Sequence, residues 1–299
     1  MKILKAPEFS DYELIDSGGF QKLERFGKYI LIRPESQAVW SKSLTDKDWR
    51  NSADALYKLN KPDESGQVQK ERGNWVKFND NMPDKWFIEY NLGQKPLKIK
   101  LSLTSFGHIG IFPEQAENWM FIEKSIRETG KANPKILNLF AYTGIASLVA
   151  GSAGAQVTHL DAVKPVVTWA RENMEASGLN DIRWIVEDAM VFVKREVTRG
   201  NSYDGLILDP PKYGRGPAGE KWLLDSMINE LVMLCSKLLE PSKSFFVMNL
   251  YSMGFSSLIA ENLIRLNFGM EKEPEFGELY ITDQHKKRLP LGIFVRFTR

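Results

Sequence analysis

The sequence predicts an α/β protein whose larger, C-terminal part contains a mostly parallel β-sheet. Between residues 135 and 213, short apolar strands alternate with amphipathic helices, which is the pattern of βαβ units. Polar residues directly follow each of these predicted strands. Residues 1–104 instead contain short alternating runs separated by turn signals, and these predict a smaller β-rich region.

The amino-acid composition is that of an ordinary globular protein. The 299 residues are 43% hydrophobic, which is ample for two folded domains. With 40 basic and 38 acidic side chains, the net charge of +2 argues neither for nor against a nucleic-acid partner. The single cysteine, Cys235, excludes an intrachain disulfide, and no apolar run is long enough to span a membrane. We therefore expect a cytoplasmic protein with no membrane segment.

We predict two domains, residues 1–104 and residues 105–299. In the first, strands are predicted at residues 26–33, 85–92 and 97–103, with a polar loop at 58–74. Aromatic residues alternate with Lys and Arg there, a mixture that suits base stacking and phosphate binding. The alternative is structural, because a thin β-rich domain also needs large side chains to fill its core.

The first predicted strand of the parallel sheet, residues 136–140, is apolar at nearly every position and is expected to be buried on both faces. The turn Ala141-Tyr-Thr-Gly144 follows, and a helix begins after it. A strand, a tight loop and a helix start allow a nucleoside to approach backbone N–H groups. Because the loop has a single glycine, it is not a dinucleotide-binding G-x-G-x-x-G motif.

Carboxylates follow the next three predicted strands, at Asp161, Glu187-Asp188 and Asp209. Asp161 lies twenty-three residues after Asn138, about where an acid at the end of the second strand binds ribose hydroxyls. Open α/β sheets bind ligands at the carboxyl ends of their strands. The sequence therefore predicts a ligand site at this edge.

Four segments taken in order resemble the motifs of one enzyme family: Asn138-Leu-Phe-Ala-Tyr-Thr-Gly144, His159-Leu-Asp161, Glu187-Asp-Ala189 and Leu208-Asp-Pro-Pro-Lys-Tyr213. The set resembles class I methyltransferases that depend on S-adenosyl-L-methionine (SAM), in particular the bacterial 23S rRNA methyltransferase group. The segment from Gly107 to Gln115 is similar to the family segment that precedes the first core strand and contacts the cofactor. The resemblance covers roughly residues 106–299.

This resemblance implies a Rossmann-like fold with a seven-stranded, mostly parallel sheet whose last strand is antiparallel. It also implies SAM as cofactor and RNA, specifically rRNA, as substrate. The residues expected to bind the cofactor are Gln115, Asn138, Phe140, Tyr142, Thr143, Gly144, Asp161, Asp188 and Asp209. Asp161 is expected to accept hydrogen bonds from the ribose hydroxyls, and Asp188 from the adenine amino group.

Asp209, Pro210 and Tyr213 are the predicted catalytic residues. Tyr213 would stack on an unstacked base, while the Asp209 carboxylate and the Pro210 carbonyl accept hydrogen bonds from an exocyclic amine. The family's cytosine-C5 members have a cysteine at the position of Tyr251, and Cys235 lies on an apolar helix stripe instead. Because C5 methylation requires a reactive thiolate, we expect methylation at nitrogen.

Two other functions remain open at this stage. One is a SAM-dependent methyltransferase of a small molecule or protein, and the other is a nucleotide-binding α/β protein that does not methylate. The single-glycine loop and the Asp-Pro-Pro turn argue against a nicotinamide enzyme. Nothing near His108 completes a metal site or a catalytic triad, so no metal is expected. No feature of the sequence defines an oligomeric state.

Toward the C-terminus, a helix is predicted at residues 221–239, with Cys235 on its apolar stripe. The last two strands are predicted at 278–282 and 291–297. The basic tip between them, residues 284–288, is expected to be solvated, with phosphate contact as the alternative.

Overall fold

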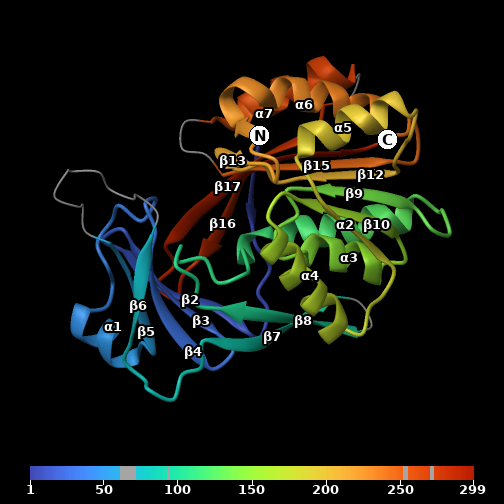
Figure 1. The fold of residues 1–299 in the computed structure, drawn as a ribbon. Coiled ribbons are helices and arrows are strands. Elements are labelled where there is room, and N and C mark those ends of the chain that lie inside the picture. Colours follow the sequence, from blue (N-terminus) through green and yellow to red (C-terminus); the bar gives the residue numbers. More distant parts are fainter. Residues whose placement is uncertain (61–71, 93–94, 252–254, 270–272) are drawn as a thin grey trace.

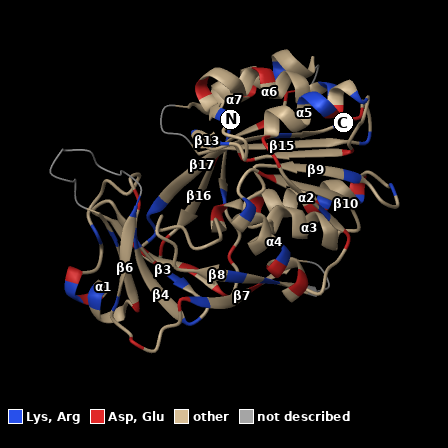
Figure 2. Cartoon of the chain, viewed as in Figure 1, with Lys and Arg blue, Asp and Glu red and all other residues tan. Residues whose placement is uncertain are grey.

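The computed structural model describes residues 1–60, 72–92, 95–251, 255–269 and 273–299. The chain forms two parts that lie side by side, a large sheet covered by helices and a smaller β-rich part (Figure 1). Figure 2 shows Lys and Arg interspersed with Asp and Glu over both parts, in keeping with the net charge of +2. The division of the chain at residue 104 stays a prediction.

The large sheet has eight strands among the described residues. In spatial order they are β1 (Lys2–Lys5), β16 (Glu275–Thr282), β17 (Arg288–Thr298), β15 (Phe245–Leu250), β12 (Gly205–Leu208), β9 (Lys135–Leu139), β10 (Gln156–Asp161) and β11 (Ile182–Val186). All neighbours are parallel except β17, which is antiparallel to both β15 and β16. The predicted α/β fold with an antiparallel last strand is confirmed.

The eighth strand is the difference from the predicted sheet of seven. β1 comes from the start of the chain and pairs with β16 at the edge, Lys2 opposite Gly277. Its four residues are mostly exposed, so the segment carries no hydrophobic pattern by which a strand could be recognised. The N-terminus is thus part of the same sheet as the C-terminal strands.

Helices cover both faces of the large sheet (Figure 1). On one face lie α2 (Ala116–Glu128), α3 (Ile145–Ser152) and α4 (Lys164–Ala176), and on the other α5 (Ala189–Thr198), α6 (Leu224–Leu238) and α7 (Ser257–Phe268). Ile136 packs in the core that contains α2 and α3, whereas Leu137 packs in the core under α5 and α6. Both are fully buried, which explains the uninterrupted apolar run. Cys235 is also fully buried, as its helical position predicts.

The predicted helix at 221–239 begins later than expected. Residues 221–223 form β14 (Lys221–Leu223), which pairs with β13 (Tyr213–Arg215) in a small hairpin after the Asp-Pro-Pro turn. Trp222 explains the difference, because its Nε1 donates to the Pro211 carbonyl at 2.6 Å and its ring lies 4.9 Å from that of Phe140. This contact holds an extended segment against the site.

The smaller part is built from a five-stranded sheet, a short helix and a hairpin. Its elements are β2 (Tyr12–Gly18), β3 (Gln21–Phe26), β4 (Tyr29–Pro34), α1 (Asp46–Ser52), β5 (Ala55–Leu59), β6 (Gly73–Lys77), β7 (Lys85–Leu92) and β8 (Lys95–Ser102), with η1 (Pro113–Gln115) before α2. The predicted pairing of the last two strands is confirmed, with Leu97, Ile99 and Leu101 buried.

Two predictions for this part need correction. The single strand predicted at 26–33 is wrong, because Gly27 adopts φ 62° and turns the chain between β3 and β4. The ends of the loop predicted at 58–74 belong to β5 and β6. Residues 61–71 of that loop lie outside the described residues.

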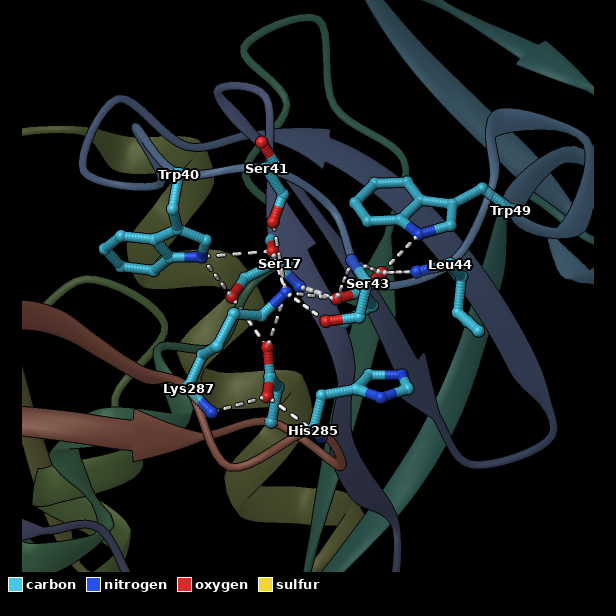
Figure 3. A network of polar contacts seen from close by, with 10 residues as sticks. Ser17, Trp40, Ser41, Ser43, Leu44, Trp49, His285 and Lys287 are labelled. Carbon is cyan, nitrogen blue, oxygen red and sulfur yellow. Dashed lines mark hydrogen bonds and ion pairs between the residues drawn. The ribbon is translucent and has the colours of Figure 1, made fainter.

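The basic tip between β16 and β17 is not simply solvated, because Lys287 reaches into the smaller part (Figure 3). Its Nζ lies 2.6 Å from Asp16 Oδ1 and 2.8 Å from Ser43 Oγ, and it also donates to the Ser17 carbonyl at 2.5 Å. Asp283, from the same tip, accepts a hydrogen bond from Ser17 Oγ at 2.8 Å. The tip therefore attaches the two parts to each other.

Asp16 is the centre of this network and has no solvent exposure. Burial raises its pKa, but hydrogen bonds from Lys287, from the backbone of Leu44 and from Trp49 outweigh burial and lower the pKa to about 2. A folded-state pKa below the ordinary value means that the ionised carboxylate stabilises the fold. That contribution, roughly 2 kcal/mol, is present above about pH 4 and is lost as the pH falls toward 2.

Replacing Lys287 with Met should lower the free energy of unfolding by about 3 to 5 kcal/mol, because Asp16 and Asp283 would remain buried without their cation. The matched control is Lys286→Met, at the exposed neighbouring position, which should change it by less than about 0.5 kcal/mol. Urea unfolding followed by tryptophan fluorescence measures both. Equal stability of the two variants would contradict a stabilising role for Lys287.

Candidate active site

A pocket opens at the carboxyl edge of the large sheet, beside β9, β12 and β15. It brings together most of the residues predicted to bind a cofactor: Gln115, Asn138, Phe140, Tyr142, Thr143, Gly144 and Asp209. Asp161 and Asp188 do not line it, and neither do Pro210 and Tyr213. Most of the residues predicted to bind the cofactor, although separated along the chain, therefore lie at one place in the fold.

The loop after β9 has an unusual backbone. Phe140 and Tyr142 both adopt positive φ, 54° and 50°, a conformation that costs a non-glycine residue about 1 to 3 kcal/mol. Gly144 has φ 86°, and a Cβ there would lie 2.9 Å from that of Ala170. Thr143 Oγ1 donates to the Gly110 carbonyl at 2.6 Å and ties the loop to the segment before η1. Such strain is typical of loops that present backbone groups to a ligand.

Asp161 braces this loop from the end of β10. Its Oδ2 accepts a hydrogen bond from the Tyr142 backbone and its Oδ1 from the Val163 backbone, both at 2.9 Å. Burial raises the pKa of Asp161, while these backbone donors oppose the shift. The carboxylate therefore lies directly behind the pocket loop, although it does not line the pocket.

Asp188 has a clear local function. It is 6% exposed, and its Oδ1 accepts a hydrogen bond from the Val191 backbone at 3.0 Å, which caps α5. Gly216 of the β13–β14 hairpin comes close to it, since a Cβ at Gly216 would lie 3.0 Å from that of Asp188. The structure thus places Asp188 under the hairpin at the end of β11.

The chemistry of the pocket lining suits a polar organic ligand such as SAM. Gln115 Nε2 and Asn249 Oδ1 are buried, line the pocket and have no hydrogen-bond partner among the described residues. An unpaired buried donor and acceptor cost free energy, which a ligand with complementary groups would recover. Aromatic rings, the strained loop and aliphatic side chains such as Ile207 and Val247 complete the lining. The donor set present is therefore suited to the cofactor that the sequence motifs imply.

Asp209 and Asn249 form a polar pair at the ends of adjacent strands. Asn249 Nδ2 donates to Asp209 Oδ1 at 2.9 Å. Burial raises the pKa of Asp209 to about 6, and the Asn249 hydrogen bond only partly opposes this. Next to this pair, Pro210 is buried, whereas Tyr213 on β13 is 53% exposed.

Sequence reasoning missed two residues here. Asn249 is the last residue but one of the buried strand β15, and a polar residue near the end of an apolar strand is the signal that could have found it. Glu114, next to Gln115, is 1% exposed, and burial raises its pKa to about 7 while Lys22 opposes the shift. Its Oε1 has no partner among the described residues. No sequence pattern marks Glu114, because its burial depends on both parts of the molecule.

Metal sites and membrane-spanning helices were also considered for the described part of the chain. It contains no group of three or more histidine, cysteine or acidic side chains placed to hold a metal ion. None of the helices described there is long and apolar enough to cross a membrane.

Comparison with known proteins agrees with this site. No family model matches the chain. The chain is 26% identical over 204 residues to ribosomal RNA large subunit methyltransferase K/L of Shewanella frigidimarina, and 30% identical over 125 residues to ribosomal RNA large subunit methyltransferase I of Shewanella amazonensis. These alignments cover 64% and 41% of this chain, but only 28% and 30% of the relatives. The chain thus spans less than a third of the length of these two relatives.

A solved structure provides the broader match. The SAM-dependent methyltransferase from Agrobacterium tumefaciens is 36% identical, with a TM-score of 0.90, and the alignment covers 100% of this chain and 93% of that one. The similarity therefore includes both the smaller part and the large sheet with its pocket. The enzyme class and the SAM cofactor follow from it, and the alternative of a nucleotide-binding protein that does not methylate is excluded. The chain belongs to the SAM-dependent methyltransferases.

Proposed function

We propose that this enzyme methylates a nitrogen atom of a base in rRNA. The observation that carries the proposal is the Asp209 and Asn249 pair, which lies beside the cofactor pocket where no thiol is present. A carboxylate and an adjacent carbonyl accept hydrogen bonds from an amine, whereas C5 chemistry would need a thiolate.

The choice of rRNA as substrate rests on the relatives. Two curated relatives are named as ribosomal RNA large subunit methyltransferases, and they align with up to 64% of the chain. We assign substrate binding to the N-terminal domain, residues 1–104. Because basic and acidic residues are interspersed there (Figure 2), any phosphate contact must come from local groups of Lys and Arg. A cytoplasmic location accords with an rRNA substrate.

In the proposed cofactor site, Asp161 accepts hydrogen bonds from the ribose hydroxyls and Asp188 from the adenine amino group. When bound, SAM supplies a methyl group that its sulfonium already activates. The protein must then orient the acceptor nitrogen and exclude water. Gln115 and the loop from Phe140 to Gly144 hold the cofactor at the edge of the sheet.

At the target base, Asp209 and the Pro210 carbonyl accept the hydrogens of the exocyclic amine, so that its lone pair faces the methyl group. Two consecutive prolines remove two backbone donors and stiffen the turn. Tyr213, exposed on β13, is the proposed stacking residue. Asp209 must be ionised to accept these hydrogens. Activity should therefore depend on the raised pKa of Asp209.

A covalent C5 mechanism is disfavoured by the position of the single cysteine. Cys235 lies on α6 in the core and is fully buried, and burial raises the pKa of its thiol. A buried thiol with a raised pKa is neither accessible nor ionised at neutral pH. Tyr251, at the position of the family's cysteine, is a phenol whose pKa is raised further by burial, so it cannot replace a thiolate.

Replacing Asp161 with Ala should weaken SAM binding by roughly 10- to 100-fold. The reason is that the substitution removes a charged group that accepts one or two hydrogen bonds from the ligand. Calorimetric titration with SAM measures the dissociation constant. Asp225→Ala, in the first turn of α6 and outside the pocket, is the control and should bind SAM as the wild type does. Wild-type affinity in Asp161→Ala would show that the ribose assignment is wrong.

Replacing Asp209 with Ala should reduce methyl transfer to rRNA at least about 100-fold, the scale of one positioned electrostatic group. The kcat/KM of the wild type should decrease below about pH 6, where Asp209 becomes protonated.

Cys235→Ser should retain most activity, with a loss of stability of about 1 to 3 kcal/mol. Radiolabelled methyl transfer at several pH values measures these effects. Loss of activity in a folded Cys235→Ser protein would contradict nitrogen methylation.

A further inference from the structure

A set of aromatic rings borders the cofactor pocket. The ring of Phe112, which lines the pocket, lies 5.6 Å from that of Tyr142 and 5.8 Å from that of Tyr251, between centroids. His108 contacts Phe112 edge to face at 5.3 Å. We call these four residues the aromatic wall. Tyr251 is 45% exposed, so its ring is accessible to a ligand.

Tyr251 lies at the same edge of the sheet as the proposed acceptor, Asp209. It directly follows β15, and β15 pairs in parallel with β12, with Met248 opposite Leu208. The next residues on the two strands, Asn249 and Asp209, are hydrogen bonded at 2.9 Å. The aromatic wall therefore extends from the cofactor pocket to the polar pair.

The smaller part supplies a second wall. Four residues at the ends of β3 and β4, the charged wall, are each at most 9% exposed: Lys22, Glu24, Arg33 and Glu35. Arg33 Nη2 lies 2.7 Å from Glu24, and Lys22 Nζ lies 3.3 Å from Glu35, so the charges offset one another. Arg33 Nη1 also donates to the Gly107 carbonyl at 3.3 Å, which attaches the charged wall to the segment that carries His108 and Phe112.

Charges of the smaller part also act on two residues of the aromatic wall. His108 is exposed, yet burial among neighbouring atoms, together with Arg33 and Lys22, lowers its pKa to about 4. Burial also raises the pKa of Tyr251 well above its ordinary value, with Glu114 and Glu35 adding to the shift. Arg33, Lys22 and Glu35, which act on these two groups, belong to the charged wall, whereas Glu114 lies next to Gln115 at the pocket.

We propose that the target base binds beside the aromatic wall and stacks on the exposed ring of Tyr251. This inference rests on the proposed function and adds a second aromatic residue that holds the base, besides Tyr213. The occupant is a nucleobase because a planar ring matches the aromatic wall, which continues to Asp209. The balanced charges of the charged wall do not favour a phosphate, so the base rather than the backbone binds there. Tyr251 supplies affinity for a base of any identity, and Asp209 acts on the reacting nitrogen.

The test compares three variants of Tyr251 on an unmodified transcript of bacterial large-subunit rRNA. Tyr251→Ala should raise the KM for the RNA by roughly 10- to 100-fold with little change in kcat, since stacking holds the base before and during transfer. Tyr251→Phe keeps the ring and should remain within about threefold of the wild type. Tyr251→Leu has apolar bulk without an aromatic face and should resemble Tyr251→Ala.

A control variant and the activity of the wild type distinguish a failure of stacking on Tyr251 from a failure of the proposed function. Leu266→Ala removes another exposed apolar side chain, on α7, outside the proposed binding regions, and should leave the KM unchanged. All variants should bind SAM normally, because Tyr251 does not line the cofactor pocket. If the wild type methylates the RNA and Tyr251→Ala keeps its KM, or if Tyr251→Leu behaves like Tyr251→Phe, stacking on Tyr251 is wrong while the proposed function stands. If the wild type does not methylate the transcript, the proposed function fails first.

Discussion

The ammonium group of Lys287 holds the two parts of this enzyme in one arrangement. It lies between Asp16 and Asp283, two carboxylates that are almost completely buried. Buried charges must be compensated, so the tip between β16 and β17 cannot leave the smaller part without a large cost. β1 adds a second connection, because it pairs with β16 in the large sheet. The smaller part is therefore fixed relative to the cofactor pocket.

This fixed arrangement explains how residues far apart in the sequence make one site. Arg33 reaches the Gly107 carbonyl, and the segment that follows leads to Phe112 and Gln115 at the pocket. From the other side, Asp209 and Asn249 meet because β12 and β15 are neighbours. The proposed cofactor pocket is lined by the large sheet, its helices and the segment before α2, whereas the proposed base site lies next to charges of the smaller part. A methyltransferase with this construction sets the distance between base and methyl group through its fold.

The sequence predicted those features of the fold that depend on local patterns of residues. The apolar run at β9, the single-glycine loop and Asp209 indicated the edge of the sheet where the pocket lies, because parallel strands end at a common edge, but Asp161 and Asp188 do not line it. Long-range contacts were not predictable. Lys287 looks like any exposed basic residue until Asp16, some 270 residues away, is brought to it. Asn249 required the pairing of β12 with β15, and β1 was too short and too polar to be recognised. The residue roles at the cofactor and at the base stay predictions.

The central claim is that methyl transfer goes to a nitrogen atom of an rRNA base, and the identity of the product tests it most directly. Unmodified large-subunit rRNA would be incubated with the enzyme and with SAM carrying a deuterated methyl group, then digested to nucleosides and analysed by mass spectrometry. We expect the label on one base nitrogen, in agreement with the acceptors at Asp209 and Pro210 and the buried position of Cys235. Labelled 5-methylcytidine, or an RNA without label, would contradict the claim.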